Sequence, residues 1–242
     1  MTTTRTSDLG WTAGQNINSE LTTFLGTMLA DDILVFDALY VLTGNPNIPV
    51  PNDVTLAAGV QGGGIEIRSF TVNTNPSLAF GSGCTLLDFT IICQDSGESP
   101  INTNGYAITV DDDFTLQNSS ISGPQKELIR VSNSDGLTVV DSELVGSYYQ
   151  IYMVGDMTNF SFTRALFRDS TGDGIKTVRA GALGSRNGTV TDCVFLRQGR
   201  DGIDTTGGWK DVVHDGCYFV KCGVAGLDLK ASPQTTVHLN TD

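Results

Sequence analysis

The chain has 242 residues, with 27 acidic and 14 basic side chains and a net charge of −13. Such an acidic protein repels nucleic acid and anionic membranes, so we expect neither as a partner. A hydrophobic fraction of 39% with 28 glycines indicates a folded, turn-rich protein, and no apolar run approaches the roughly 18 residues of a membrane span.

The N-terminal part of the chain predicts a capping helix over residues 16–30. A helix there can close the first turn of a coil, and "DDILVFDALYVL" after it is typical of strands. The N-terminal segment lacks the hydrophobic core of a signal peptide. We expect an extracellular or particle-associated protein with no signal peptide in this chain. The apolar face of the helix would consist of Ile17, Leu21, Phe24, Leu25, Met28 and Leu29.

An eight-residue frame, x-T-V-x-D-x-x-F, recurs along the chain every 23 to 30 residues. Strand-like pieces at so regular a step indicate a β-solenoid. The predicted frames begin at Val54, Cys84, Phe114, Leu137, Phe160, Gly188 and Asp211. A last frame at Thr235 stops within its turn. We therefore expect one domain over 1–242, with a solenoid from about residue 33 and further C-terminal turns or another chain over its open end.

A second series of strands precedes these frames, at 107–110, 128–131, 150–153, 174–177, 202–205 and 226–229. Alternation of side chains predicts an inward aliphatic column of Ile108, Ile129, Ile151, Ile175, Ile203 and Leu227. The matching outward column is Thr109, Arg130, Tyr152, Lys176, Asp204 and Asp228. Neighbouring members lie roughly 4.8 Å apart, so the outward column is a surface on which function can be built.

The repeated "DGI" and "TVTDCVF" units, the N-terminal helix and "PNDVTLAAG" resemble the right-handed parallel β-helix, pectin-lyase-like superfamily. The resemblance implies an all-β, right-handed parallel β-helix with an N-terminal capping helix, a fold that hosts several chemistries. The polygalacturonase motifs GHG and RIK and the epimerase motif DPH are absent. Alginate and chondroitin lyases of this superfamily pair a lysine base with an arginine 21 residues later, which is the spacing of Lys176 and Arg197.

The outward column suits β-elimination on a uronic-acid polymer, alginate first and then pectate or a glycosaminoglycan. A base takes the C5 proton, an acid protonates the leaving oxygen, and cations neutralise the sugar carboxylate. The resemblance assigns Lys176 as the base and Arg197 as its partner, and Tyr152 is the candidate acid. With an anionic polysaccharide as the partner, substrate contacts are predicted for Arg130, Tyr149, Arg179, Arg200 and Asp204.

Two other functions stay open: a non-catalytic attachment module, such as a tailspike-like or adhesin fragment, and a glycoside hydrolase that uses Asp204 and Asp228. These carboxylates repel one another unless a cation intervenes. Calcium bound by both would supply that cation. The alternative is an ion pair between Lys176 and Asp204, with Lys230 screening Asp228. No other cofactor is expected.

Cysteine and histidine offer little catalytic chemistry in this sequence. The five cysteines lack the spacing of a zinc site, so we expect buried free thiols. His214 and His238 lie away from the Lys176 column, so histidine general-base catalysis and zinc hydrolysis are not expected.

Overall fold

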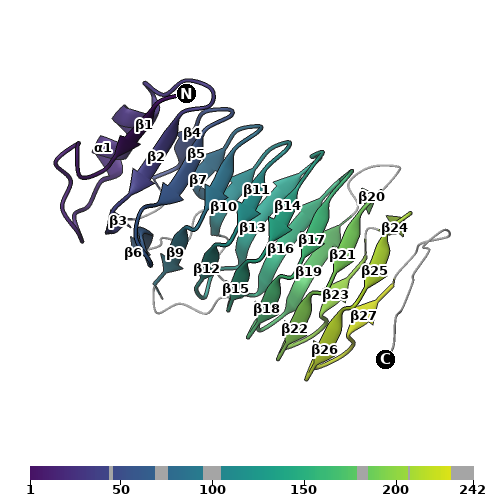
Figure 1. The fold of residues 1–242 in the computed structure, drawn as a ribbon. Coiled ribbons are helices and arrows are strands. Elements are labelled where there is room, and N and C mark those ends of the chain that lie inside the picture. Colours follow the sequence, from purple (N-terminus) through teal and green to yellow (C-terminus); the bar gives the residue numbers. More distant parts are fainter. Residues whose placement is uncertain (44–45, 69–75, 95–104, 179–184, 207, 230–242) are drawn as a thin grey trace.

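The computed structural model describes residues 1–43, 46–68, 76–94, 105–178, 185–206 and 208–229. The chain winds as a right-handed parallel β-solenoid through three sheets, A, B and C, one strand of each per turn (Figure 1). The predicted all-β fold is therefore confirmed. Within the described ranges, no helix is long and apolar enough to cross a membrane.

The strands of each sheet stack in chain order along the coil axis. Sheet A contains β1 (Thr3–Arg5), β2 (Ile33–Phe36), β5 (Thr55–Ala58), β8 (Thr85–Leu87), β11 (Thr115–Gln117), β14 (Thr138–Val140), β17 (Ser161–Thr163), β21 (Thr189–Thr191) and β25 (Val213–Asp215). Sheet B contains β3 (Leu39–Thr43), β6 (Gly64–Arg68), β9 (Thr90–Cys93), β12 (Ser120–Ser122), β15 (Glu143–Val145), β18 (Leu166–Arg168), β22 (Val194–Leu196) and β26 (Tyr218–Val220). Sheet C contains β4 (Ile48–Val50), β7 (Pro76–Phe80), β10 (Tyr106–Val110), β13 (Glu127–Ser132), β16 (Tyr149–Val154), β19 (Asp173–Val178), β23 (Ile203–Asp204) and β27 (Leu227–Asp228). A separate pair joins β20 (Ser185–Arg186) to β24 (Trp209–Lys210).

The register of sheet A confirms six of the seven predicted frames, whose second residues form one row: Thr55, Thr85, Thr115, Thr138, Ser161 and Thr189. The frame predicted from Asp211 is wrong by one residue, because Thr189 pairs with Val213 and not with Val212. A shift of one residue exchanges the two faces of a strand. Val212 and His214 consequently face the core, whereas Val213 is 37% exposed.

Sheet C confirms the inward aliphatic column. Ile108, Ile129, Ile151, Ile175, Ile203 and Leu227 lie in one register, and the five isoleucines are fully buried. Complete burial of such a side chain stabilises the fold by about 1.5–3 kcal/mol. In sheet B, the rings of Phe167, Phe195 and Phe219 stack with centroids 4.7 and 4.9 Å apart. The core is thus built from repeated contacts between neighbouring turns.

The N-terminal cap is shorter than the predicted helix. Helix α1 spans Asn18–Leu25 and packs on β3 and β4 through Leu21 and Leu25, which are fully buried. The chain then leaves the helix through a turn, and Leu29, predicted on the apolar face, is 72% exposed. Strand β1 precedes α1 and pairs with β2, so the coil already begins before the helix (Figure 1).

Candidate functional site

Each central strand of sheet C bends, and the bend brings together side chains three residues apart. In β13, Leu128 and Ile129 are consecutive and both fully buried, whereas side chains of a straight strand alternate. The residues on either side of this pair, Glu127 and Arg130, therefore share the outer face. Their Oε2 and Nη1 atoms lie 3.1 Å apart.

The bend creates two parallel files of side chains on the outer face of sheet C. The second file is the predicted outward column, and its register is confirmed: Thr109, Arg130, Tyr152, Lys176, Asp204 and Asp228. The first file was predicted only at Tyr149, and it contains Tyr106, Glu127, Tyr149 and Asp173 in register. Asp201 continues it, because its backbone amide donates to Asp173 Oδ1 at 3.1 Å.

Aromatic rings and a guanidinium occupy the N-terminal half of these files. The rings of Tyr149 and Tyr152 stack with centroids 5.1 Å apart, and Tyr148 meets Tyr149 edge-on at 4.5 Å. The guanidinium of Arg130 lies 4.7 Å from the ring of Tyr106 and 5.3 Å from that of Tyr152. All five side chains are only half-buried. They form a continuous amphipathic surface over three turns.

Buried carboxyl groups lie beneath this surface. The side chain of Glu127 is 1% exposed, and burial raises its pKa to about 7 against the opposing effect of Arg130. Burial likewise raises the pKa of Asp173, although Asp201 donates a backbone hydrogen bond to it. Burial also raises the pKa of Tyr152. The first file therefore contains two buried carboxyl groups whose pKa values are raised by burial.

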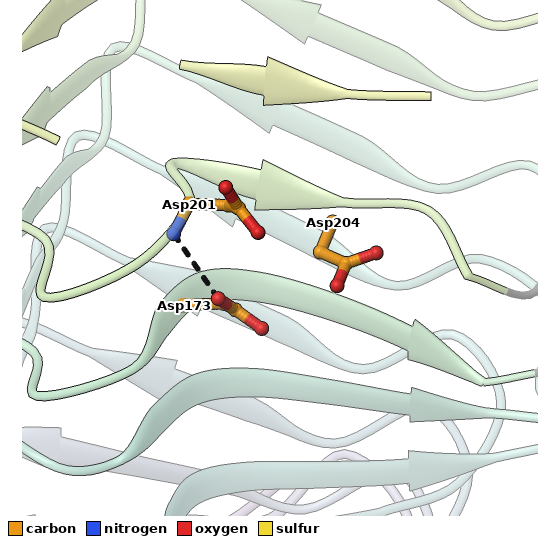
Figure 2. Close-up of side chains that lie close together, drawn as sticks. All are labelled: Asp173, Asp201 and Asp204. Carbon is orange, nitrogen blue, oxygen red and sulfur yellow. Dashed lines mark hydrogen bonds between the residues drawn. The ribbon is translucent and has the colours of Figure 1, made fainter. Parts of the chain in front are cut away.

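Lys176 was predicted to face outward from the sheet, and in that position it is nearly buried, at 9% exposed. Its Nζ donates to Asp204 and, at 2.9 Å, to Thr206 Oγ1, and it lies 3.8 Å from Asp173 Oδ2. The Nζ atom therefore makes two hydrogen bonds and one longer ion-pair contact. Figure 2 shows Asp173 and Asp201 at the start of adjacent strands, with Asp204 further along.

The sequence left two ways to compensate the charge of Asp204, a calcium ion or an ion pair with Lys176, and the structure contains the ion pair. Asp173, Asp201 and Asp204 are buried, with ligand atoms within 4.8 Å of one another. Oxygen ligands of this kind suit a hard cation. The ammonium of Lys176 already supplies a positive charge against two of these carboxylates. Calcium between Asp204 and its register neighbour Asp228 stays a prediction.

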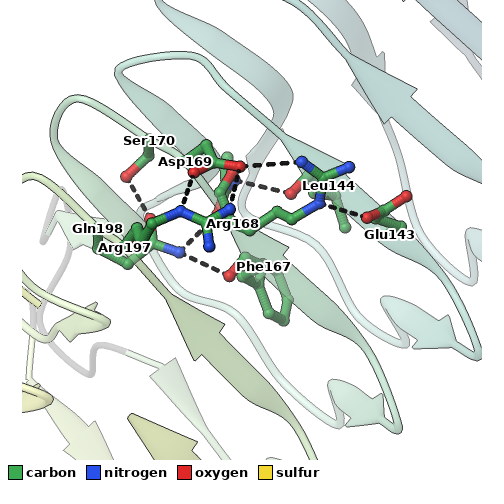
Figure 3. Close-up of polar contacts among 9 residues, drawn as sticks. Glu143, Leu144, Phe167, Arg168, Asp169, Ser170, Arg197 and Gln198 are labelled. Atoms are coloured by element: carbon green, nitrogen blue, oxygen red, sulfur yellow. Dashed lines mark hydrogen bonds and ion pairs between the residues drawn. The ribbon is translucent and has the colours of Figure 1, made fainter. Parts of the chain in front are cut away.

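Arg197 lies in a different ion-pair network, on the turn that follows β22 (Figure 3). Its Nε and Nη2 atoms donate to Asp169 at 2.6 and 2.8 Å. Asp169 also accepts from Arg168, which bonds Glu143 in turn. The hydrogen bond from Arg197 lowers the pKa of Asp169 to about 2. The structure does not join Arg197 to Lys176 through any contact among the residues it describes.

Two further residues, Arg179 and Arg200, were predicted to contact the substrate. Arg200 reaches the first file, where its Nε lies 3.9 Å from Asp173 Oδ1, and Tyr148 and Asp173 raise its pKa. Arg179 lies outside the described residues. Sheet C thus brings together most of the predicted site: Arg130, Tyr149, Tyr152, Lys176, Arg200 and Asp204. Sequence reasoning did not include Glu127, Asp173 and Asp201 among the site residues, although each stands three residues before a member of the predicted column.

A groove of about 770 Å³ lies on another part of the coil, where the turns from sheet A to sheet B meet the segment 58–62. Several charged and polar side chains that line this groove bond to one another. Arg164 bonds Asp141 through two contacts of 2.7 Å, and Asn118 donates to Asp88 at 2.6 Å. We assign the candidate site to sheet C, because perturbed acids and exposed rings coincide there.

Comparisons with known proteins agree with this architecture. A family model, the right-handed β-helix region, matches residues 101–241. The ORF18 protein of Geobacillus virus E2 is similar, with a TM-score of 0.53 and 10% identity over 93% of this chain, which spans only 59% of the viral protein. A candidate glycosyl hydrolase of Parabacteroides merdae has a TM-score of 0.53 and 11% identity, covering 90% of this chain and 98% of its own. A mannuronic-acid-specific family 6 polysaccharide lyase from human gut microbiota has a TM-score of 0.44 and 11% identity, and the match covers 93% of this chain and 60% of the lyase. No curated protein matches the chain.

Proposed function

Because this chain belongs to the right-handed β-helix family, we propose that it is a carbohydrate-active protein that binds a polysaccharide along the outer face of sheet C. The observation that carries this proposal is the surface formed by Tyr106, Arg130, Tyr149 and Tyr152 over three turns. Half-exposed aromatic faces pack well on the apolar faces of sugar rings. A glycan along the coil axis meets a new turn about every 4.8 Å.

The charges of this face favour an uncharged glycan over the anionic polysaccharide predicted from the sequence. Arg130 faces Glu127, and Lys176 faces Asp204. The more exposed Arg200 lies within 3.9 Å of Asp173. A uronate carboxylate would compete with a protein carboxylate for each of these cations. We therefore place neutral glycans first and uronate polymers second.

β-Elimination with Lys176 as base is a second candidate for the reaction. One contact favours it, since Tyr152 is the register neighbour of Lys176 and can serve as the acid. The Nζ atom would first have to leave Asp204 and Thr206. The carboxylate-neutralising role would fall to Arg130 or Arg200, because Arg197 is bonded to Asp169.

Hydrolysis has its own candidate acid in Glu127, whose pKa of about 7 leaves about half of these carboxyl groups protonated at neutral pH. Asp173 stands two turns along the same file, about 9.6 Å away at strand spacing, near the carboxyl separation of inverting glycosidases. Asp204 and Asp228, the pair predicted from sequence, stand one turn or about 4.8 Å apart, which is closer to the retaining geometry.

The test is binding and product analysis on a panel of neutral and uronate polysaccharides, with Tyr152→Ala compared to Tyr218→Ala. Tyr218 is a matched control, since it is 64% exposed on sheet B. We expect Tyr152→Ala to weaken binding about tenfold, because a ring contact contributes about 0.5–1.5 kcal/mol beyond its buried area. Equal affinity of the two variants, or no binding to any polymer, contradicts the proposal.

The products then distinguish the reactions. Unsaturated uronate ends, which absorb ultraviolet light, indicate elimination. New reducing ends without that absorbance indicate hydrolysis. Binding without any product indicates an attachment module of the tailspike or adhesin kind.

A further inference from the structure

Two cysteines occupy the same place in consecutive turns, at the corner between sheets A and B. Thr191 pairs with Asp215 and Val194 with Tyr218, so Cys193 stands directly beside Cys217. In-register parallel strands place their Cα atoms about 4.8 Å apart, within the 4.4–6.8 Å that a disulfide requires. Cys193 is fully buried and Cys217 is half-buried, so only Cys217 is open to a reagent.

The sulfur atoms of both residues lie over the end of β21. Cys193 Sγ is 3.4 Å from the carbonyl oxygen of Thr191, and Cys217 Sγ is 3.3 Å from that of Val190. The same row at earlier turns contains Phe89, Ser119, Ser142 and Ala165. The thiols therefore replace apolar or hydroxyl side chains at a fixed position of the coil, and they do so in two adjacent turns.

A histidine is buried beside this pair. His214 is 2% exposed, and its ring interacts with the side chain of Cys217. It occupies the inward row of Phe162 and Val190, and its ring stacks on Trp209 at 5.1 Å. A polar imidazole in this apolar row, in contact with a thiol, is not explained by packing alone.

The surroundings of Cys217 favour its thiolate. The Cys193 thiol and the neighbouring His214 lower the pKa of Cys217 to about 5, whereas the pKa of Cys193 is raised. The other titratable groups near this corner are Asp215 on β25, Tyr218 on β26 and Asp192, whose carboxylate lies against Gly216. A half-exposed thiolate beside a second thiol is the arrangement of a peroxide-sensitive cysteine with its resolving partner.

We propose that Cys217 and Cys193 are a redox-active pair that hydroperoxides convert into a disulfide joining two consecutive turns. The Cys217 thiolate attacks the peroxide oxygen, which breaks the O–O bond, leaves a sulfenic acid and releases, after protonation, water or an alcohol. The Cys193 thiol then attacks that sulfur, forms the S–S bond and releases water. Two electrons pass from the two thiols to the peroxide, and a small-molecule thiol reverses the change.

The test uses the folded wild-type chain and its own internal control. Cys222 is also half-buried and lies in the same C-terminal part of the coil, but burial raises its pKa. Brief alkylation with iodoacetamide at mildly acidic pH, followed by peptide mass spectrometry, should label Cys217 at least about tenfold faster than Cys222. Equal rates for the two cysteines overturn the proposal.

Hydrogen peroxide is the probe for the second step. After treatment, we expect a peptide pair linked through Cys193 and Cys217, with Cys222 still free. In Cys193→Ser the link should be lost, and dimedone should trap the sulfenic acid on Cys217. In His214→Asn the rate at which iodoacetamide alkylates Cys217 at mildly acidic pH should fall toward the rate for Cys222. Absence of the linked peptide in the wild-type chain, where no substitution affects folding, also overturns the proposal.

Discussion

Lys176→Met removes the ammonium that faces Asp204 and Asp173 while keeping the length of the side chain. Lys176 is 9% exposed, and both carboxylates are fully buried. Removing one partner of a buried ion pair typically costs about 3–5 kcal/mol, because the remaining charge keeps its desolvation penalty. We therefore expect the free energy of unfolding to fall by about 3–5 kcal/mol at neutral pH. Loss of activity in this variant would accordingly be no evidence for a catalytic base.

The pH dependence distinguishes this electrostatic cost from a loss of packing. Burial already raises the pKa of Asp173, and removing the ammonium raises it further. A carboxyl group whose folded pKa is raised opposes folding when it ionises, so stability returns as the pH falls through that folded pKa. Lys176→Met should consequently lose less stability at mildly acidic pH than at neutral pH.

Urea unfolding of the wild type and the variants measures the effect. Lys210→Met is the matched control, because Lys210 is 51% exposed and lies 3.9 Å from the exposed Asp211, where an ion pair contributes at most about 1 kcal/mol. Adding Asp204→Asn to Lys176→Met should recover part of the loss. The reasoning is refuted if Lys176→Met unfolds at the same urea concentration as Lys210→Met at neutral pH.

Three further substitutions address the core, the first file and the outer ion pairs. Ile151→Ala should lower the free energy of unfolding by about 2–5 kcal/mol in urea, through lost transfer energy and a cavity; a change below about 1 kcal/mol would contradict the stacked core. The free energy of unfolding of Glu127→Gln should rise by up to about 3 kcal/mol relative to that of the wild type as the pH increases from 4.5 to about 7. The reason is that the wild-type carboxyl group ionises at lower pH in the unfolded chain than in the folded one, which destabilises the wild type over this range. A difference that does not change with pH would argue against the raised pKa of Glu127. Arg197→Ala should cost less than about 1 kcal/mol and leave glycan binding unchanged, because its pair with Asp169 is exposed; weakened binding would place Arg197 in the site.

The sequence alone was sufficient to predict the coil and the second file. A parallel solenoid keeps one register from turn to turn, so residues with the same role recur at the spacing of a turn. Tyr152, Lys176 and Asp204 could therefore be aligned without coordinates. The same logic was less reliable at the seventh frame, where "DVVHDGCY" permits two registers and only the burial of Val212 and His214 decides between them.

The first file, the burial of Lys176 and the position of Arg197 were decided by the tertiary structure. Two consecutive inward residues, such as Leu128 and Ile129, break the alternation that a sequence-based assignment assumes, and the resulting bend turns Glu127 onto the same face as Arg130. Arg197 has the spacing of a lyase arginine, yet it pairs with a carboxylate of the preceding turn. Periodicity specifies which residues stack along the coil, whereas bends and turns determine which of them meet across it.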